Sequence, residues 1–181
     1  MKKHVAIALL LFAFPLLAAD PTLDVVKEKS SIQFIGRKMI GQHLGNFSGF
    51  DGTVTLTNGQ PSAVSFTIDL NTVKTDRERL DNHLKSPDFW DVANHPTASF
   101  KSSRVTKKSD SEYTVDGIFN LRGINNPISI PATVTKEEGV VRVKAEFGID
   151  RHKWNVSYKG QADNLIKDEV TVMLDLAFPQ P

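Results

Sequence analysis

Residues 83–92 read HLKSPDFWDV and differ in character from the rest of the chain. Just upstream, Thr75 and Glu78 have the spacing of a capping box, in which a threonine and a glutamate satisfy the first N–H groups of a helix. Pro87 ends the helical run, because proline disfavours the helical conformation for the residue before it. Two large aromatic residues then follow on a connection instead of a strand. The sequence therefore predicts a short helical insert, about residues 76–92, whose rings cover an apolar surface.

On both sides of this insert, apolar residues alternate with polar ones, which is the period of a half-buried β-strand. Turn sequences such as Asn58-Gly59 separate the alternating runs at hairpin spacing, so parallel strands joined by helices are not expected. The apolar stripes are Ile32 and Phe34; Val54 and Leu56; Val64 to Leu70; Ala98 and Phe100; Tyr113 to Leu121; Ile128 to Val134; Val141 to Phe147; and Val170 to Phe178. The predicted fold class is all-β, with about eight antiparallel strands.

A sheet of about eight strands either packs as a sandwich or closes as a barrel. Closure removes the two unpaired edges, and an eight-stranded barrel leaves room for one small ligand. In a barrel, the helical insert would cap or line one mouth. The alternation of apolar residues does not distinguish the two architectures.

Composition excludes several classes of protein. The chain has 181 residues, with 22 Lys and Arg against 21 Asp and Glu, and therefore a net charge of +1. A protein that binds nucleic acid by neutralising phosphates should carry a basic excess, so nucleic acid is not an expected partner. The chain has no cysteine, which excludes disulfides, thiolate nucleophiles and cysteine-ligated metals. The length suits one globular domain.

The N-terminus has the pattern of a secretory signal peptide. Basic residues at 2–3 precede an almost entirely apolar run, and small residues stand at 18–19. The apolar run is shorter than the roughly 20 residues that span a bilayer, so an uncleaved anchor is the less favoured alternative. We expect residues 1–19 to be a cleaved signal peptide, residues 20–181 to form one domain, and the mature protein to be periplasmic.

No motif of an enzyme stands out. The sequence has no GxSxG nucleophile elbow, no glycine-rich phosphate loop with its lysine, and no histidine spacing typical of a zinc site. Carboxylates are numerous, but nothing singles out a facing pair for acid–base chemistry. We therefore expect no catalytic residues, no metal and no cofactor. The distinctive feature that remains is the supply of phenylalanine rings, 11 in the whole chain.

The insert and the residues after it resemble a known family. Residues 83–92, together with HPTASFKS at 95–102, are similar to the helical signature of the YceI-like family of polyisoprenoid-binding, lipocalin-like proteins. Weaker similarities accompany it at residues 30–34, 47–52, 117–124, 127–128, 147–151 and 168–170. The resemblance implies a lipocalin-like barrel whose interior holds an isoprenoid or related long-chain amphiphile, such as a polyprenyl or quinone tail, for storage or transport.

Candidate ligand contacts follow from the apolar stripes and the insert. For an apolar tail they are Phe34, Phe66, Leu84, Phe89, Trp90, Phe100 and Phe119. For a polar head group they are His83, Arg151 and Lys153. Two alternatives stay open: a stress-response or interaction module with a packed core and no ligand, and an enzyme that acts on a lipid held in the barrel. The resemblance also allows a homodimer and transient contact with a membrane.

Overall fold

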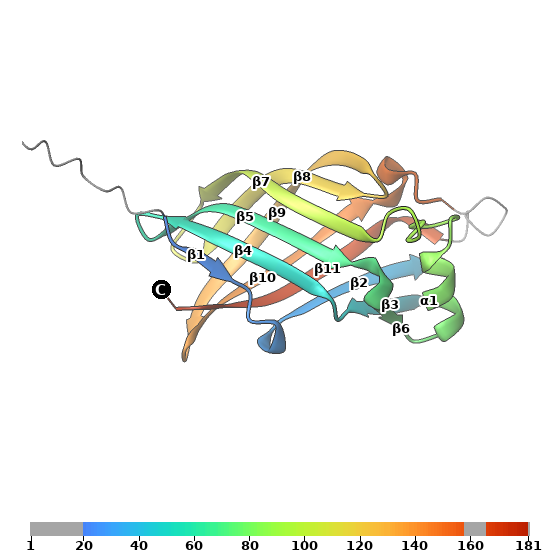
Figure 1. Ribbon diagram of the computed structural model, residues 1–181, viewed down its shortest axis with the longest axis horizontal. Helices are drawn as coiled ribbons and strands as arrows, with labels where there is room; N and C mark the ends of the chain where they lie inside the picture. The colour runs from blue at the N-terminus through green and yellow to red at the C-terminus, as the bar shows by residue number, and fades with distance from the viewer. Residues whose placement is uncertain (1–19, 158–165, 181) are drawn as a thin grey trace, which may run out of the picture.

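The computed structural model describes residues 20–157 and 166–180. These residues form one strongly curled antiparallel sheet with a short α-helix at one end (Figure 1). The all-β class and the lipocalin-like antiparallel architecture are thereby confirmed, and a single curled sheet replaces the alternative of a two-sheet sandwich. The predicted signal peptide, residues 1–19, lies outside the described residues.

Within the described residues the sheet contains eleven strands, in the order β1-β4-β5-β7-β8-β9-β10-β11-β2-β3-β6. The elements are β1 (Thr22–Asp24), η1 (Lys27–Lys29), β2 (Ser31–Lys38), β3 (Gln42–Phe47), β4 (Phe50–Thr57), β5 (Gln60–Asp69), η2 (Leu70–Thr72), β6 (Val73–Thr75), α1 (Glu78–Lys85), β7 (Thr97–Lys107), β8 (Glu112–Leu121), β9 (Ile124–Glu137), β10 (Val140–Asp150), η3 (Arg151–Trp154) and β11 (Ile166–Pro179). The predicted stripes lie on eight of these strands.

The three strands that the apolar pattern misses are β1, β3 and β6. β1 and β6 have only 3 residues each, which is too short to show a period. β3 has Gly45 opposite Phe34 of β2, so a glycine stands where an inward apolar side chain would reveal the strand. The difference from the expected strand number therefore has a local cause in each case.

The segment after β1 joins β4 and β11, two strands that lie far apart in the order of the sheet. The N–H of Val25 donates to the carbonyl of Gly52 on β4 at 2.9 Å, and the N–H of Val26 donates to the carbonyl of Ala177 on β11 at 2.8 Å. Just before β4 begins, the N–H of Gly49 donates to Thr72 Oγ1 at 2.9 Å. These bonds hold the rolled sheet without a disulfide.

The helical insert is present, but its start differs from the prediction. α1 begins at Glu78, and the preceding residue, Arg77, makes no side-chain capping bond. Thr75 donates its hydroxyl to Asp81 Oδ1 at 2.6 Å and so contacts the helix one turn further along. The predicted capping box is therefore wrong, because Thr75 stands two residues before the N-cap, where its hydroxyl oxygen accepts the N–H of Arg77 at 3.2 Å instead of a helical N–H.

Asp81 fastens α1 to β6. Its side chain is buried, and Oδ1 also accepts the N–H of Thr75 at 2.7 Å, while Oδ2 lies 3.2 Å from Lys74 Nζ. Burial by itself would raise the pKa of this carboxyl, but the hydrogen bonds from Thr75 and the ammonium of Lys74 outweigh burial and hold the pKa below its ordinary value of 3.8. The ionised form is therefore the one that the fold prefers.

The Asp81→Asn variant is expected to lose about 1–3 kcal/mol of unfolding free energy at neutral pH, because a buried charged acceptor is removed. A carboxyl whose pKa falls on folding contributes stability above its unfolded pKa, and that contribution is lost as the pH falls through the folded value. The difference between the variant and the wild type should therefore shrink below pH 3.8 in urea unfolding.

The matched control for this measurement is Asn82→Ala, on the exposed side of the same helix. It should change the unfolding free energy by less than about 0.5 kcal/mol at either pH. Equal stability of Asp81→Asn and wild type at neutral pH would show that the carboxylate does not fasten the helix.

Candidate ligand cavity

The curled sheet encloses a cavity of about 630 Å³. Its lining comes from the inward side chains of the long strands and from α1 with the turn that follows it. An ordinary protein core leaves few voids larger than a water molecule, whereas small-molecule pockets measure roughly 300–1,000 Å³. The interior of this barrel therefore has the volume of a ligand site.

The cavity runs along the barrel from end to end. At the α1 end its lining includes Leu84, Phe89 and Trp90, and at the opposite end it includes Lys107 and Lys136. Since a volume of about 630 Å³ extends over this whole length, the cavity is long and narrow. This shape suits an extended chain better than a compact ring system.

Three of the inward phenylalanines lie over glycines of neighbouring strands. Phe34 on β2 faces Gly45 on β3, and Phe66 on β5 faces Gly52 on β4. A Cβ atom added to either glycine would overlap the ring of its partner, and Phe100 stands in the same relation to Gly117. The glycines thus let these rings lie close against the wall instead of filling the interior.

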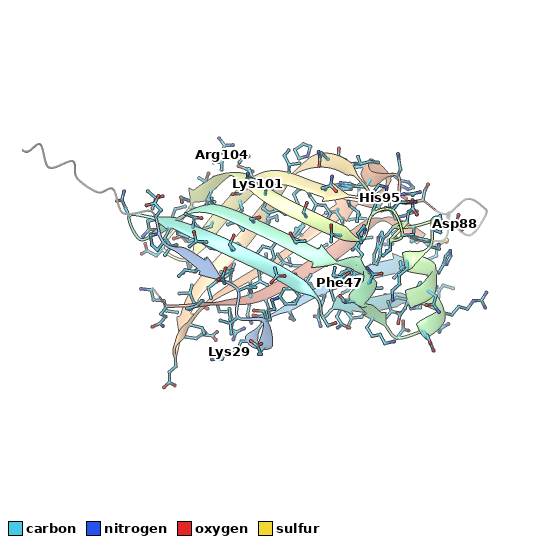
Figure 2. The ribbon with its side chains drawn as sticks, in the orientation of Figure 1. Lys29, Phe47, Asp88, His95, Lys101 and Arg104 are labelled. Carbon is cyan, nitrogen blue, oxygen red and sulfur yellow. The ribbon has the colours of Figure 1, made fainter. Side chains whose placement is uncertain are left out.

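The turn after α1 closes one end of the barrel with aromatic rings. Trp90 packs edge-on against Phe34, with ring centroids 5.8 Å apart, and its centroid is 5.7 Å from that of Phe47. Figure 2 shows Phe47 inside the barrel and Arg104 projecting from its outer surface. The aromatic residues of the insert therefore cover the apolar interior, as their position on a connection predicts.

The structure brings all the apolar candidates for tail contact to the cavity. They are Phe34, Phe66, Leu84, Phe89, Trp90, Phe100 and Phe119. Whether they contact a ligand stays a prediction. Their common placement follows from two sequence features, the period of the strands and the aromatic insert.

The polar candidates are not brought together. Of the three, Arg151 lines the cavity, whereas His83 packs its ring edge-on against Phe89 at 4.8 Å and Lys153 is exposed on η3. The carbonyl of Lys153 accepts a hydrogen bond from Asn126 at 2.7 Å, which ties η3 to β9. The structure thus places one of the three predicted head-group residues at the cavity.

Arg151 has a structural task that the sequence does not reveal. Its guanidinium is buried and donates to the carbonyl oxygens of Val156 at 2.9 Å, Lys167 at 3.3 Å and Ile166 at 3.4 Å. Asp168 lies 3.7 Å from the same group. Arg151 therefore joins the two chain segments on either side of residues 158–165.

Basic side chains at the two ends of the cavity were not among the predicted contacts. Lys38 and His43 line it at the α1 end, and Lys107 and Lys136 line it at the other. A sequence signal exists for two of them, because Lys38 continues the inward stripe of β2 and Lys136 continues that of β9. A lysine that ends an apolar stripe marks the point where the strand leaves the dry interior.

His43 also connects β3 with the segment before α1. Its Nδ1 lies 2.8 Å from Asp76 Oδ1, and this hydrogen bond is the main reason that the pKa of Asp76 is lowered. The contact fixes the imidazole at the α1 end of the cavity, beside Lys38. The described part of this end therefore offers polar groups held in place by the fold.

The described residues contain no cluster of His, Cys, Asp or Glu suited to hold a metal ion. No helix among them is long and apolar enough to cross a membrane.

The sequence is similar to a known protein family and to several bacterial proteins. The model of the YceI-like domain matches residues 23–178. A UPF0312 protein of Pectobacterium atrosepticum is 35% identical over 130 residues, which is 70% of this chain and 67% of the relative. A UPF0312 protein of Pseudomonas aeruginosa is 36% identical over 119 residues, 64% of this chain and 62% of the relative.

Solved structures share the fold at lower sequence identity. BcnA of Burkholderia cenocepacia matches with a TM-score of 0.79 and 22% identity, over 84% of this chain and 98% of BcnA. A polyisoprenoid binding domain from Saccharophagus degradans matches with a TM-score of 0.70 and 15% identity, over 88% of this chain and 98% of that domain. The family match spans nearly all of the described barrel, and this chain belongs to the YceI-like family.

Proposed function

We propose that this protein binds an isoprenoid or a related long-chain amphiphile inside the barrel and stores or carries it in the periplasm. The observation that carries the proposal is the long apolar cavity of about 630 Å³, lined by aliphatic and aromatic side chains. The polyisoprenoid binding domain from Saccharophagus degradans, which shares the fold, supports the choice of ligand class. The location rests on the predicted signal peptide, residues 1–19.

The energetics suit reversible carriage. Each methylene group moved from water into the barrel gains about 0.8 kcal/mol, so a tail of several isoprene units would not return to water at a useful rate. A membrane interior is as dry as the barrel, and transfer between the two is close to neutral. The barrel can therefore exchange its ligand with a membrane without a large change in free energy.

A polar head group would find partners at the ends of the cavity. Lys38 and His43 at the α1 end, or Lys107 and Lys136 at the other, place polar nitrogen groups next to the apolar lining. Arg151 remains a candidate, although its guanidinium already serves three carbonyl groups of the chain. The described geometry favours the lysines over His83 and Lys153 for this contact.

The two alternative functions have less support. A module that acts only through its surface would have a filled core, whereas this interior is open. An enzyme acting on a barrel-bound lipid needs a set of reactive groups, and the described residues do not point to one.

The purified protein should release an isoprenoid or another long-chain amphiphile on extraction with organic solvent, at close to one molecule per barrel. Mass spectrometry of the native protein and of the extract measures the mass and the amount. A protein that contains no lipid and takes up no fluorescent polyprenyl probe would contradict the proposal.

Filling the cavity should abolish binding without unfolding the protein. Ala132 on β9 is buried and lines the cavity, so Ala132→Phe places a ring in the lumen. We expect the amount of bound polyprenyl probe to fall at least about tenfold, which corresponds to about 1.4 kcal/mol. Fluorescence titration measures the binding, and circular dichroism confirms the β-sheet.

The adjacent residue provides the matched control. Thr133 is exposed on the outer face of the same strand, so Thr133→Phe adds the same ring outside the barrel. This variant should bind the probe like the wild type. Equal binding by the folded Ala132→Phe variant would show that the ligand does not occupy the lumen.

A further inference from the structure

The hairpin formed by β2 and β3 ends in two exposed apolar side chains. Met39 is 77% exposed and Ile40 is 93% exposed, more than the other large hydrophobic residues that the structure shows at the surface, Leu44 at 47% and Ile118 at 43%. Figure 1 shows this hairpin at the end of the barrel that carries α1. A hairpin turn does not require large apolar residues. Exposed apolar side chains that gather at one place, unlike those scattered singly, mark a surface that binds a partner.

The apolar surface continues from the tip onto the outer face of the hairpin. Leu44 on β3 stands opposite Ile35 on β2, and both point away from the lumen, since their neighbours Phe34 and Gly45 form the inward pair. We call Ile35, Met39, Ile40 and Leu44 the hairpin patch. The patch forms a protruding tip with one apolar flank.

Two cations directly precede the apolar tip. Arg37 and the exposed Lys38 stand immediately before Met39, and Arg37 donates to the neutral hydroxyl of Thr171, which leaves its charge uncompensated by that contact. The carboxylate of Asp76 on the adjoining segment pairs with His43 at 2.8 Å. The tip therefore combines large apolar side chains with a positive collar.

We propose that the hairpin patch docks on an anionic lipid bilayer, with Met39 and Ile40 entering the boundary of the acyl chains and Arg37 and Lys38 contacting lipid phosphates. Apolar side chains flanked by cations are the pattern by which surface elements bind such membranes. A bilayer accepts the tip without a matching groove.

Docking would also place one end of the cavity at the membrane. Lys38 and His43 belong both to this hairpin and to the cavity lining. A lipid leaving the bilayer at this point would meet the lumen without crossing bulk water. This consequence rests on the proposed function, whereas the docking itself does not.

Vesicle flotation tests the docking. The purified protein is mixed with vesicles of phosphatidylglycerol and phosphatidylcholine in equal parts, or of phosphatidylcholine alone. Met39→Ser/Ile40→Ser should bind the anionic vesicles at least about tenfold more weakly than the wild type. Lys38→Gln should weaken binding to the anionic vesicles and leave the weak binding to phosphatidylcholine unchanged.

Ile118→Ser is the matched control, because Ile118 is an exposed residue on the outer face of β8 and lies outside the hairpin. This variant should bind the vesicles like the wild type. All variants have the same N-terminal residues, so those residues do not contribute to any difference in vesicle binding. A direct probe is Ile40→Trp, whose emission should shift to the blue with anionic vesicles. Ile118→Trp should show no shift.

Unchanged vesicle binding by Met39→Ser/Ile40→Ser would overturn the proposal. So would a change in its oligomeric state without a change in vesicle binding, because that result would assign the tip to a second copy of the chain. Extraction of Met39→Ser/Ile40→Ser separates the two proposals: this variant should keep the lipid content of the wild type. A protein without lipid that still binds vesicles through the tip would refute carriage and retain docking.

Discussion

The contact on which the open interior depends is a phenylalanine ring lying over a glycine of the next strand. In the pairs Phe34 with Gly45 and Phe66 with Gly52, any side chain on the glycine would push the ring into the lumen. A glycine within a strand costs about 0.5–1 kcal/mol relative to alanine, and an aromatic neighbour that covers it offsets part of this cost. The inner surface of the barrel is therefore apolar, and the cavity that it surrounds is left open for a ligand.

Side chains around an open cavity make fewer packing contacts than side chains in a filled core. The fold therefore needs stabilising interactions elsewhere in the barrel. The chain has no cysteine, and β4 and β11, which lie far apart in the sheet order, are joined instead by backbone bonds from Val25 and Val26. At the α1 end, Trp154 is 1% exposed and donates its indole N–H to the carbonyl of Phe119 at 3.1 Å. Buried polar links of this kind stabilise the rim, where they do not occupy the cavity.

The sequence predicts the wall of this protein better than its ends. The alternation along the long strands decides which face each side chain takes, and so the candidates on the strands, Phe34, Phe66, Phe100 and Phe119, all line the cavity. A three-residue strand such as β6 has no measurable period, and the inward position of β3 at Gly45 carries no side chain. The direction of His83 or Lys153 depends on how the insert and η3 pack, which no local pattern records. The cavity position of the lysines that end inward stripes is predictable from the sequence, since Lys136 keeps the period of β9.

For a carrier of this design, the cavity and the surface would govern different quantities. Because the barrel and the bilayer are both dry, the apolar lining adds little to the choice between them, and a ligand shifts only by the difference in its free energy in the two places. That difference has to come from the polar end of the ligand, where Lys38 and His43 or the opposite lysines stand. The rate of exchange has a separate origin, since a long tail crosses water slowly and contact with the membrane removes that step. The lumen would therefore set which tail is accepted, the charged rim would set how firmly it is kept, and the hairpin patch would set how fast it is exchanged.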